Sequence, residues 1–505
     1  MDNQTRGVFD RIIRLHPKVL FIIRFYAFQP SIHENMVLLN MTNGNATDMR
    51  YTNATLTDGG LMNSLTLQWE ASAAEKMTTM LSYLDRQYPG RIAGSFPCYL
   101  HTSEWFMPGV NDIGIGGKSK LSDYSPATEK RFCAETRANT NSTCAMPLPS
   151  QRNTPALGSG FADVDTTELN LYFADAVAHA IETLATAAKN VSNGKLMTMS
   201  FYGYLMGLAD SRLAGSGHLA LHRLLRFSDL DAIASPYMYN NLVRNNSKGP
   251  LLPHGPWDAA PAHGKVWIVE DDSRTSLASP TPLKFTEDAA GDFDLMRRNV
   301  LTSLLRGNSL YFYDLATEGW FGRPDRVAET DKLWAGIKSA LAALSGAASS
   351  VASMVSDSAV NSAGSVTTTV VDLKPEVAVF VDDVSAATRT VFDDGSDFLG
   401  TLLHYPPIII GSIGAPTRVF VLSDLLLPDY DWSGFRMCVF LNAFVVTPEL
   451  SEAISTKLKR GNTTLVWQVS WNFNGEHRSL HRCTMLTNWN TLAQCSCCTV
   501  RSRRV

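Results

Sequence analysis

The sequence lacks any apolar run long enough to cross a membrane. VLFII at 19–23 is bounded by Lys18 and Arg24, as a short buried strand would be, whereas a spanning helix needs roughly 18 residues or more. Charge of one sign is also lacking, because the formal net charge is only -4. That balance leaves no basic field for phosphate backbones. We therefore expect neither a membrane span nor a nucleic-acid partner.

Cysteine is scarce, with eight residues in 505. Cys133 and Cys144 are spaced to close a small surface loop, and Cys495, Cys497 and Cys498 crowd a basic tail without a matching ligand pair. We expect no metal site and no cofactor.

The first residues after Met1 are polar and lack the apolar core of a secretory signal. A secreted or lumenal location therefore requires a signal peptide on an N-terminal segment missing from this sequence. N-X-S/T sequons, which would suit that location, start at Asn40, Asn45, Asn53, Asn141, Asn190, Asn245 and Asn462.

Apolar runs of strand length alternate with longer helical patterns from residue 17 to 325. The amphipathic stretches that suit covering helices are Ser72–Gln87, Leu169–Ala188 and Asp292–Leu305. A (β/α)8 barrel needs eight strands, so these patterns predict an incomplete (β/α)8 TIM-type barrel. The predicted strands are Val19–Phe25, Arg91–Ser95, Leu196–Tyr202, Ala232–Ser235, Lys265–Val269 and Ser309–Tyr313.

A second, smaller α/β region follows a stretch rich in Ala, Ser, Gly and Val. Its strand candidates are VAVFV at 377, TRVFVLS at 417, FRMCVFLNAFVV at 435 and TTLVWQV at 463, with a helical pattern over 449–460. We expect a catalytic barrel over 1–335, an Ala/Ser-rich linker over 336–370, an α/β domain over 371–470 and an irregular basic, Cys-containing tail over 471–505.

Glu270 stands directly after a buried strand in GKVWIVEDDSRT. Barrel enzymes place catalytic groups at that end of a strand. A strand-ending acid more often solvates a loop or caps a helix, but here Asp272 and Arg274 crowd the same segment. A nearby guanidinium keeps a carboxylate ionised, as a nucleophile requires.

Glu104 lies beside Trp105, Phe106 and Met107 in AGSFPCYLHTSEWFMPG. Partial burial against aromatic groups raises a carboxyl pKa, which suits a general acid working near neutral pH. The alternative is a glutamate whose stem covers an apolar surface while its head stays in water.

Two carboxylates on strands of one barrel are the arrangement that cleaves glycosidic bonds. Aromatic side chains at predicted strand ends could stack on sugar rings, although each alone is more often part of a core. Beside the catalytic pair Glu104 and Glu270, the candidate substrate-binding residues are Arg24, Trp105, Tyr202, Tyr239, Asp272, Arg274 and Trp320.

Several long motifs occur in the order SFYGYLMGLADSRLAGSGHLALHRLL, SPYMYNN, HGKVWIVEDDSRT and YFYDLATEGWFG. With them the chain resembles β-galactosidase-like enzymes related to glycoside hydrolase family 42 over residues 9 to 325. The resemblance implies that Glu104 in TSEW is the acid/base and Glu270 in VWIVEDD is the nucleophile.

The resemblance also implies that the region 371–470 is the family's flavodoxin-like middle domain, which is associated with trimer formation. Residues 9–30 resemble the third βα unit of such barrels, so the first two strands are absent and the chain resembles an N-terminally truncated member. Ser103 stands where the family usually has an asparagine before the acid/base.

The leading functional hypothesis is a retaining glycosidase acting on a β-galactoside or a related sugar, with an oligosaccharide or glycoside as its partner. The alternative is a catalytically inactive carbohydrate-binding or structural homologue. A flavodoxin-like cofactor protein is a third option, but VDDVSAATR after the strand at 377 lacks a phosphate-cradling glycine pattern.

The sequence predicts the geometry of the catalytic pair. If both carboxylates serve a retaining mechanism, their carboxyl groups should face one cavity about 5 to 5.5 Å apart. The Arg24 guanidinium should point into the same cavity. A crystal structure measures both features; a carboxyl separation near about 9 Å would favour inversion instead.

Overall fold

The computed structural model describes most of the chain. The described residues are 3–29, 31–40, 45–48, 62–109, 120–136, 144–152, 162–207, 210–244, 249–279, 286–315, 317–347, 375–391, 400–458, 463–468 and 485–487.

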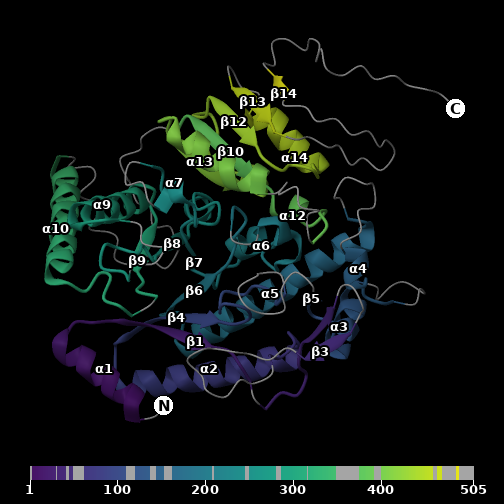
Figure 1. Cartoon of the computed structure of the whole chain (residues 1–505), viewed down its shortest axis with the longest axis horizontal. Helices are drawn as coiled ribbons and strands as arrows, with labels where there is room; N and C mark the ends of the chain where they lie inside the picture. The colour runs from purple at the N-terminus through teal and green to yellow at the C-terminus, as the bar shows by residue number, and fades with distance from the viewer. Residues whose placement is uncertain are drawn as a thin grey trace.

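A six-stranded, wholly parallel sheet forms the centre of the first region (Figure 1). The chain crosses this sheet in sequence order, as the strands of a (β/α)8 barrel do, with two strands fewer. The predicted incomplete barrel is confirmed, and each predicted strand corresponds to one observed strand. In spatial order the strands are β1 Phe21–Tyr26, β4 Ile92–Cys98, β6 Met197–Phe201, β7 Ala232–Pro236, β8 Val266–Asp271 and β9 Ser309–Phe312.

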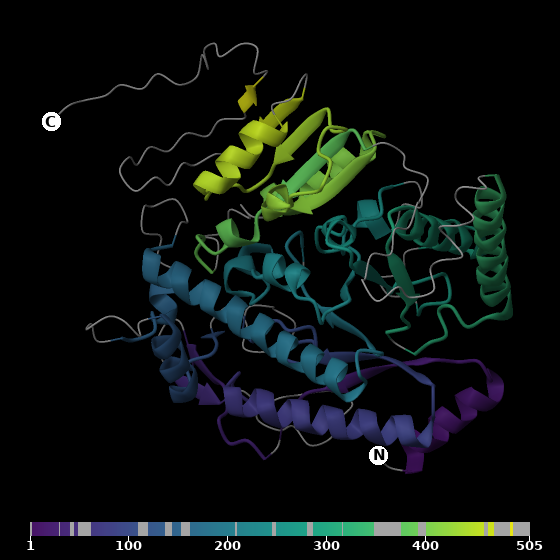
Figure 2. The same ribbon diagram turned by 180° about the vertical axis from the view of Figure 1, so that it is seen from behind.

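Helices α2, α5 and α9 confirm the three predicted amphipathic stretches, and each begins at a side-chain cap. Thr66, Asp163 and Asp288 accept hydrogen bonds from the first-turn amides of these helices. Figures 1 and 2 show α2 and α5 side by side beneath the sheet. The helices of this region are α1 Asn3–Leu15, α2 Leu67–Gln87, α3 Pro126–Thr136, α4 Pro149–Arg152, α5 Val164–Val191, η2 Asp210–Gly215, α6 Leu221–Arg226, α7 Asn241–Arg244, α8 Ala259–Ala262, α9 Ala289–Leu305 and α10 Pro324–Ala347.

The first region also contains a small antiparallel sheet with the strand order β3-β2-β5. Its strands are β2 Val37–Asn40, β3 Ala46–Asp48 and β5 Lys120–Leu121. Cys133, which lies in α3, and Cys144 form a disulfide, as the sequence predicted. Cys495, Cys497 and Cys498 lie outside the described residues.

The second sheet has the strand order β11-β10-β12-β13-β14. Its first four strands are parallel and follow the 2-1-3-4 order of a flavodoxin-like fold, whereas β14 is antiparallel. The strands are β10 Val377–Val381, β11 Thr417–Val421, β12 Met437–Phe440, β13 Thr464–Trp467 and β14 Met485–Thr487. The helices are α12 Asp383–Ala386, η3 Gly400–His404, α13 Tyr405–Ser412, η4 Leu422–Leu426, α14 Pro448–Ala453 and η5 Ile454–Leu458.

Two elements of the structure lie inside segments that were expected to be a linker and an irregular tail. The linker expected over 336–370 begins inside α10, which continues to Ala347 because its Ala- and Leu-rich sequence favours a helix; residues 348–370 lie outside the described residues. The tail expected over 471–505 contributes β14 to the second sheet. The four expected domain limits otherwise remain a prediction.

Strand β10 shows why the second sheet lies against the first region. Val377, Val379 and Val381 belong to the same buried cluster as the barrel strands. Ala378 and Phe380, which point the other way, belong to a separate core rich in aromatic rings. Both faces of this strand are therefore buried, as its unbroken apolar sequence predicts.

Asp258 lies at the contact between the two regions and is 3% exposed. Its carboxylate accepts hydrogen bonds from Arg306 at 2.7 and 3.0 Å, from Arg418 at 2.8 Å and from the backbone amide of Val419 at 2.7 Å. His263 and His222 make two more such contacts, each with a buried aspartate of the second region. The second sheet, green to yellow in Figure 2, is therefore attached through charged groups as well as apolar ones.

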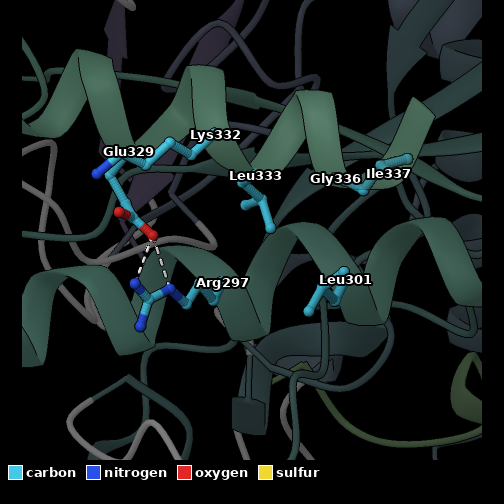
Figure 3. Close-up of a pocket in the computed structure, with 7 residues that line it drawn as sticks. All are labelled: Arg297, Leu301, Glu329, Lys332, Leu333, Gly336 and Ile337. Carbon is cyan, nitrogen blue, oxygen red and sulfur yellow. Dashed lines mark hydrogen bonds and ion pairs between the residues drawn. The ribbon is translucent and has the colours of Figure 1, made fainter. Parts of the chain in front are cut away.

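No helix in the part of the chain that the structure describes is long and apolar enough to span a bilayer. A surface groove of about 540 Å³ lies between α9 and α10, where Arg297 and Glu329 pair at one end and Leu301, Leu333 and Ile337 line the rest (Figure 3). Neither candidate catalytic glutamate lines this groove.

We expect Asp258→Asn to weaken the attachment of the second region. The substitution leaves the guanidinium groups of Arg306 and Arg418 without a carboxylate, and removing one partner of a buried ion pair costs about 3–5 kcal/mol. Urea unfolding measures the change in the free energy of unfolding. Asp294→Asn is the matched control, because the Asp294–Arg297 pair is exposed and worth about 0–1 kcal/mol. Equal effects of the two variants would contradict the role given to Asp258.

Candidate active site

Glu270 is the penultimate residue of β8, and the alternation of side chains along this strand determines which face of the sheet it lies on. It is paired in register with Tyr311 of β9 and Pro236 of β7. Side chains alternate along a strand, so Glu270 and Asp272 face one side while Asp271 faces the other. Asp271 accepts hydrogen bonds from Asn299 of the outer helix α9 and from Ser273. Glu270 therefore faces the inside of the curved sheet.

Glu104 reaches the same end of the sheet on the turn that follows β4. Four non-glycine residues of this turn have a positive φ: Leu100 (60°), Thr102 (57°), Ser103 (64°) and Trp105 (68°). Backbone of this kind costs about 1–3 kcal/mol per residue and is concentrated at functional sites. Backbone hydrogen bonds from Trp105 to Tyr99 and from Met107 to Ser216 hold the turn in place.

The two glutamates lie close enough to influence each other's charge. Glu104 is 9% exposed and Glu270 is 5% exposed. Burial raises the pKa of Glu104. Burial, and then the negative charge of Glu104, raise the pKa of Glu270 to about 8. The two carboxyl groups therefore share one low-dielectric site at the carboxyl end of the sheet, where two negative charges are unfavourable.

Phenol groups donate a hydrogen bond to each acid. Tyr204 donates to Oε1 of Glu104 at 3.1 Å, and Tyr311 donates to Oε2 of Glu270. Both bonds favour the charged form of the carboxyl group that accepts them. Neither tyrosine is among the site residues predicted from the sequence. The sequence signal for Tyr311 is its place in SLYF, the strand that follows the one carrying Glu270. In the structure these two strands are neighbours and Tyr311 pairs with Glu270.

Arg24 supplies the positive charge of the site. Its guanidinium lies over the rings of Phe96 and Phe201, at 5.7 and 5.1 Å from their centroids, and its Nε lies 3.3 Å from the Cys98 sulfur. It lowers the pKa values of Glu104 and Glu270, although burial outweighs this effect. Arg24 thus lies on the side of the sheet where its charge acts on both glutamates.

The other arginine predicted for the site is Arg274. Its guanidinium lies over the ring of Trp320, at 5.8 Å from the centroid. Because Arg24 reaches the acids from β1, the positive neighbour of Glu270 comes from a strand distant in sequence. The role expected for Arg274 beside Glu270 stays a prediction.

Three of the proposed sugar-binding aromatic residues are buried in the protein. Trp105 and Tyr202 are 0% exposed and Trp320 is 2% exposed. The Trp105 indole donates to the Pro97 carbonyl, and the Tyr202 hydroxyl donates to the Gly217 carbonyl. We reassign these rings to packing, because a fully covered ring cannot stack on a sugar.

Tyr239 is the exposed member of the aromatic set, at 46%. Its hydroxyl donates to Asp272 at 3.3 Å, and Asp272 also accepts from Arg244 at 2.7 Å. The Arg244 guanidinium lies 3.7 Å from the centroid of the Tyr239 ring. Asp272 therefore orients Tyr239 and pairs with Arg244 close to the two glutamates.

The second region reaches this part of the molecule through His404. Its Nε2 lies 3.0 Å from Nδ2 of Asn240, the residue after Tyr239. His254 is buried between the rings of Tyr204 and Tyr239. Among the described residues, no three His, Cys, Asp or Glu side chains converge where a metal ion could bind.

We expect Glu270→Gln to stabilise the protein at alkaline pH. The folded-state pKa of Glu270, about 8, lies above that of a free glutamate, about 4.3. The stability that the protonated group contributes is present below about pH 4.3 and is lost as pH rises through about 8. Glutamine carries no charge at any pH. The difference in the free energy of unfolding, variant minus wild type, should thus grow from pH 4 to pH 9, reaching about 5 kcal/mol. Glu75→Gln on the surface of α2 is the control. If the difference from wild type were independent of pH for both variants, burial would not raise the pKa of Glu270.

No protein-family model matches the chain, and no curated protein matches its sequence. Solved structures do match. Gan42B, a family 42 β-galactosidase, superposes with a TM-score of 0.51 at 11% identity, over 94% of this chain and 66% of its own. The β-galactosidase of Rahnella sp. R3 gives 0.46 at 14% identity, over 91% and 60%. An exo-carrageenase of family 42 from Bacteroides ovatus gives 0.48 at 12% identity, over 84% and 56%.

The chain spans less than two thirds of the length of each of these proteins. At such low identity the match concerns the fold, and the superposition on Gan42B is the one above a TM-score of 0.5 among the three. The chain has the fold of a glycoside hydrolase family 42 β-galactosidase, with an incomplete barrel followed by a separate α/β sheet.

Proposed function

We propose that the chain is a retaining glycoside hydrolase that cleaves a β-galactoside or a related β-linked sugar. The observation that carries this proposal is the pair of buried carboxyl groups of Glu104 and Glu270. Glu270 lies at the carboxyl end of β8, Glu104 lies on the turn after β4 of the same parallel sheet, and the charge of Glu104 raises the pKa of Glu270. The shared fold with Gan42B, which is a β-galactosidase, supports the same choice.

The mechanism needs one ionised and one protonated carboxyl group. Glu270 as carboxylate attacks the anomeric carbon while Glu104 gives its proton to the departing oxygen. The bond to the leaving group breaks, and an ester between the sugar and Glu270 forms. Glu104, now ionised, removes a proton from water, which attacks the same carbon and releases Glu270. The pair thus begins and ends with one proton.

Arg24 and Tyr239 are the proposed substrate contacts. Arg24 faces both acids, so its guanidinium can donate to a sugar hydroxyl or stabilise the charge on Glu270. Tyr239 offers an exposed ring near the acids, and Asp272 fixes its hydroxyl. We assign Asp272 to positioning, because Arg244 and Tyr239 occupy its oxygens.

The alternative function is a catalytically inactive carbohydrate-binding or structural homologue. One observation favours it: with a pKa of about 8, Glu270 is largely protonated at neutral pH and cannot attack. Hydrolysis of an aryl β-galactoside between pH 6 and 10 separates the two functions. A rate that rises through about pH 8 supports the enzyme, and no turnover at any pH supports the alternative.

A nucleotide or flavin role for the second sheet has little support. The first-turn amides of α12, where a phosphate would bind, donate to the carboxylate of Asp382. The Asp382 carboxyl group therefore occupies the amides that would otherwise hold a phosphate. The trimer that the family resemblance implies remains a prediction.

The roles of the two glutamates can be separated by kinetics. Glu270→Gln removes the nucleophile, so even substrates with good leaving groups should not turn over. Glu104→Gln removes proton transfer only, so an activated aryl glycoside should still form the covalent intermediate. Azide needs no general base and should then restore turnover. Natural substrates with poor leaving groups should stay slow.

The readouts are steady-state rates with and without azide and the mass of the trapped enzyme. Equal losses on activated and natural substrates, without azide rescue, would refute the acid/base role of Glu104. Glu75→Gln is the control for a change of glutamate to glutamine outside the site.

A further inference from the structure

Strand β9 and the residue that follows it bring two tyrosines close to the site. Tyr311 pairs in register with Glu270, so both side chains project on the same face of the sheet. Tyr313 directly follows β9, where its backbone amide donates to the Asp271 carbonyl; burial raises its pKa and Arg24 lowers it. The last strand of the sheet and the residue after it therefore supply phenol groups beside the proposed nucleophile and beside its positive neighbour.

The Tyr311 hydroxyl donates to Oε2 of Glu270. Burial and then the charge of Glu270 raise the pKa of Tyr311, so the phenol remains a proton donor over the whole working pH range. Because the Tyr311 hydroxyl occupies Oε2, Oε1 is the oxygen that can meet the anomeric carbon. The bond thus sets both the orientation and the charge preference of the carboxyl group.

The surroundings of Glu270 make this donor important. Burial and the neighbouring Glu104 disfavour its charge, and Asp272 adds a weaker effect of the same sign. Tyr311 and Arg24 act in the opposite direction. The other titratable groups that face these acids are Cys98, Tyr204, Tyr239 and Tyr313.

We propose that Tyr311 is a positioning residue of the reaction, which favours the ionised form of Glu270 and orients it for attack through its hydrogen bond to Oε2. The inference rests on the proposed glycosidase function. It goes beyond that function by naming the residue of β9 on which the nucleophile depends.

The first test compares Tyr311→Phe with wild type in hydrolysis of an activated aryl β-galactoside between pH 6 and 10. A charge-assisted hydrogen bond shifts a carboxyl pKa by about one unit. We expect the acidic limb of kcat/KM to move up by about one pH unit, with about a tenfold loss at pH 7 that recedes above about pH 9.

Tyr124→Phe is the matched control. It also removes one phenol, whose hydroxyl donates to the Pro147 carbonyl, away from both acids. Its pH profile should keep the shape of the wild-type profile. A Tyr311→Phe variant whose activity is reduced by the same factor at every pH would overturn the proposal, because a packing defect has no reason to follow the ionisation of Glu270.

A second measurement does not depend on activity, so it still decides the matter if wild type proves inert and the proposed function fails. Thermal melting between pH 4 and 10 is recorded for wild type, Tyr311→Phe, Glu270→Gln and the double variant. Loss of the donor should destabilise the protein increasingly as pH rises through about 8, where Glu270 becomes charged. In the Glu270→Gln background that pH-dependent part should vanish. The same pH dependence in both backgrounds would overturn the role of Tyr311 towards Glu270.

Discussion

The confinement of two carboxyl groups in one buried site is the constraint on which the rest of this structure depends. Water cannot stabilise both charges there, so one proton tends to remain on the pair. Burial raises the pKa of both Glu104 and Glu270, and their repulsion adds to the rise for Glu270. Arg24, Tyr204 and Tyr311 partly offset that cost with a positive charge and two hydrogen bonds. A shared proton is what a double-displacement mechanism needs, because one acid must donate while the other attacks.

The parallel sheet makes this confinement possible because every strand ends at the same edge. β4 delivers Glu104 on a turn with unusual backbone, β8 delivers Glu270, and the two outermost strands of the described sheet deliver Arg24 and Tyr311. The second region is tied to the first by Asp258, His222 and His263, and it reaches the segment beside Tyr239 through His404. The environment of the acids thus draws on segments from the first strand to beyond residue 400.

Much of this arrangement could be predicted. All six strands of the first sheet follow from apolar runs of strand length, and α2, α5 and α9 follow from helical periodicity. Glu270 could be located because an acidic residue directly after an apolar run of strand length is recognised from neighbouring residues alone. The aromatic residues were harder: Trp105 and Tyr202 look like sugar platforms in the sequence, yet both are fully buried and bonded to backbone carbonyls. The local sequence shows that an aromatic residue lies near a strand end. The direction of its side chain depends on the φ angles of the turn, which the amino-acid composition does not determine.

The sequence by itself determined the order of strands and helices, the face on which each strand residue lies, and the two glutamates that stand at strand ends. Those features are local, since periodicity and side-chain alternation act over a few residues. Only the tertiary structure decided which charges meet. Arg24, from the first strand, acts on the charge of Glu270, and Tyr311 bonds to Glu270. Such pairings join residues up to hundreds of positions apart, and their energies depend on distance and burial, which exist only after the sheet has formed.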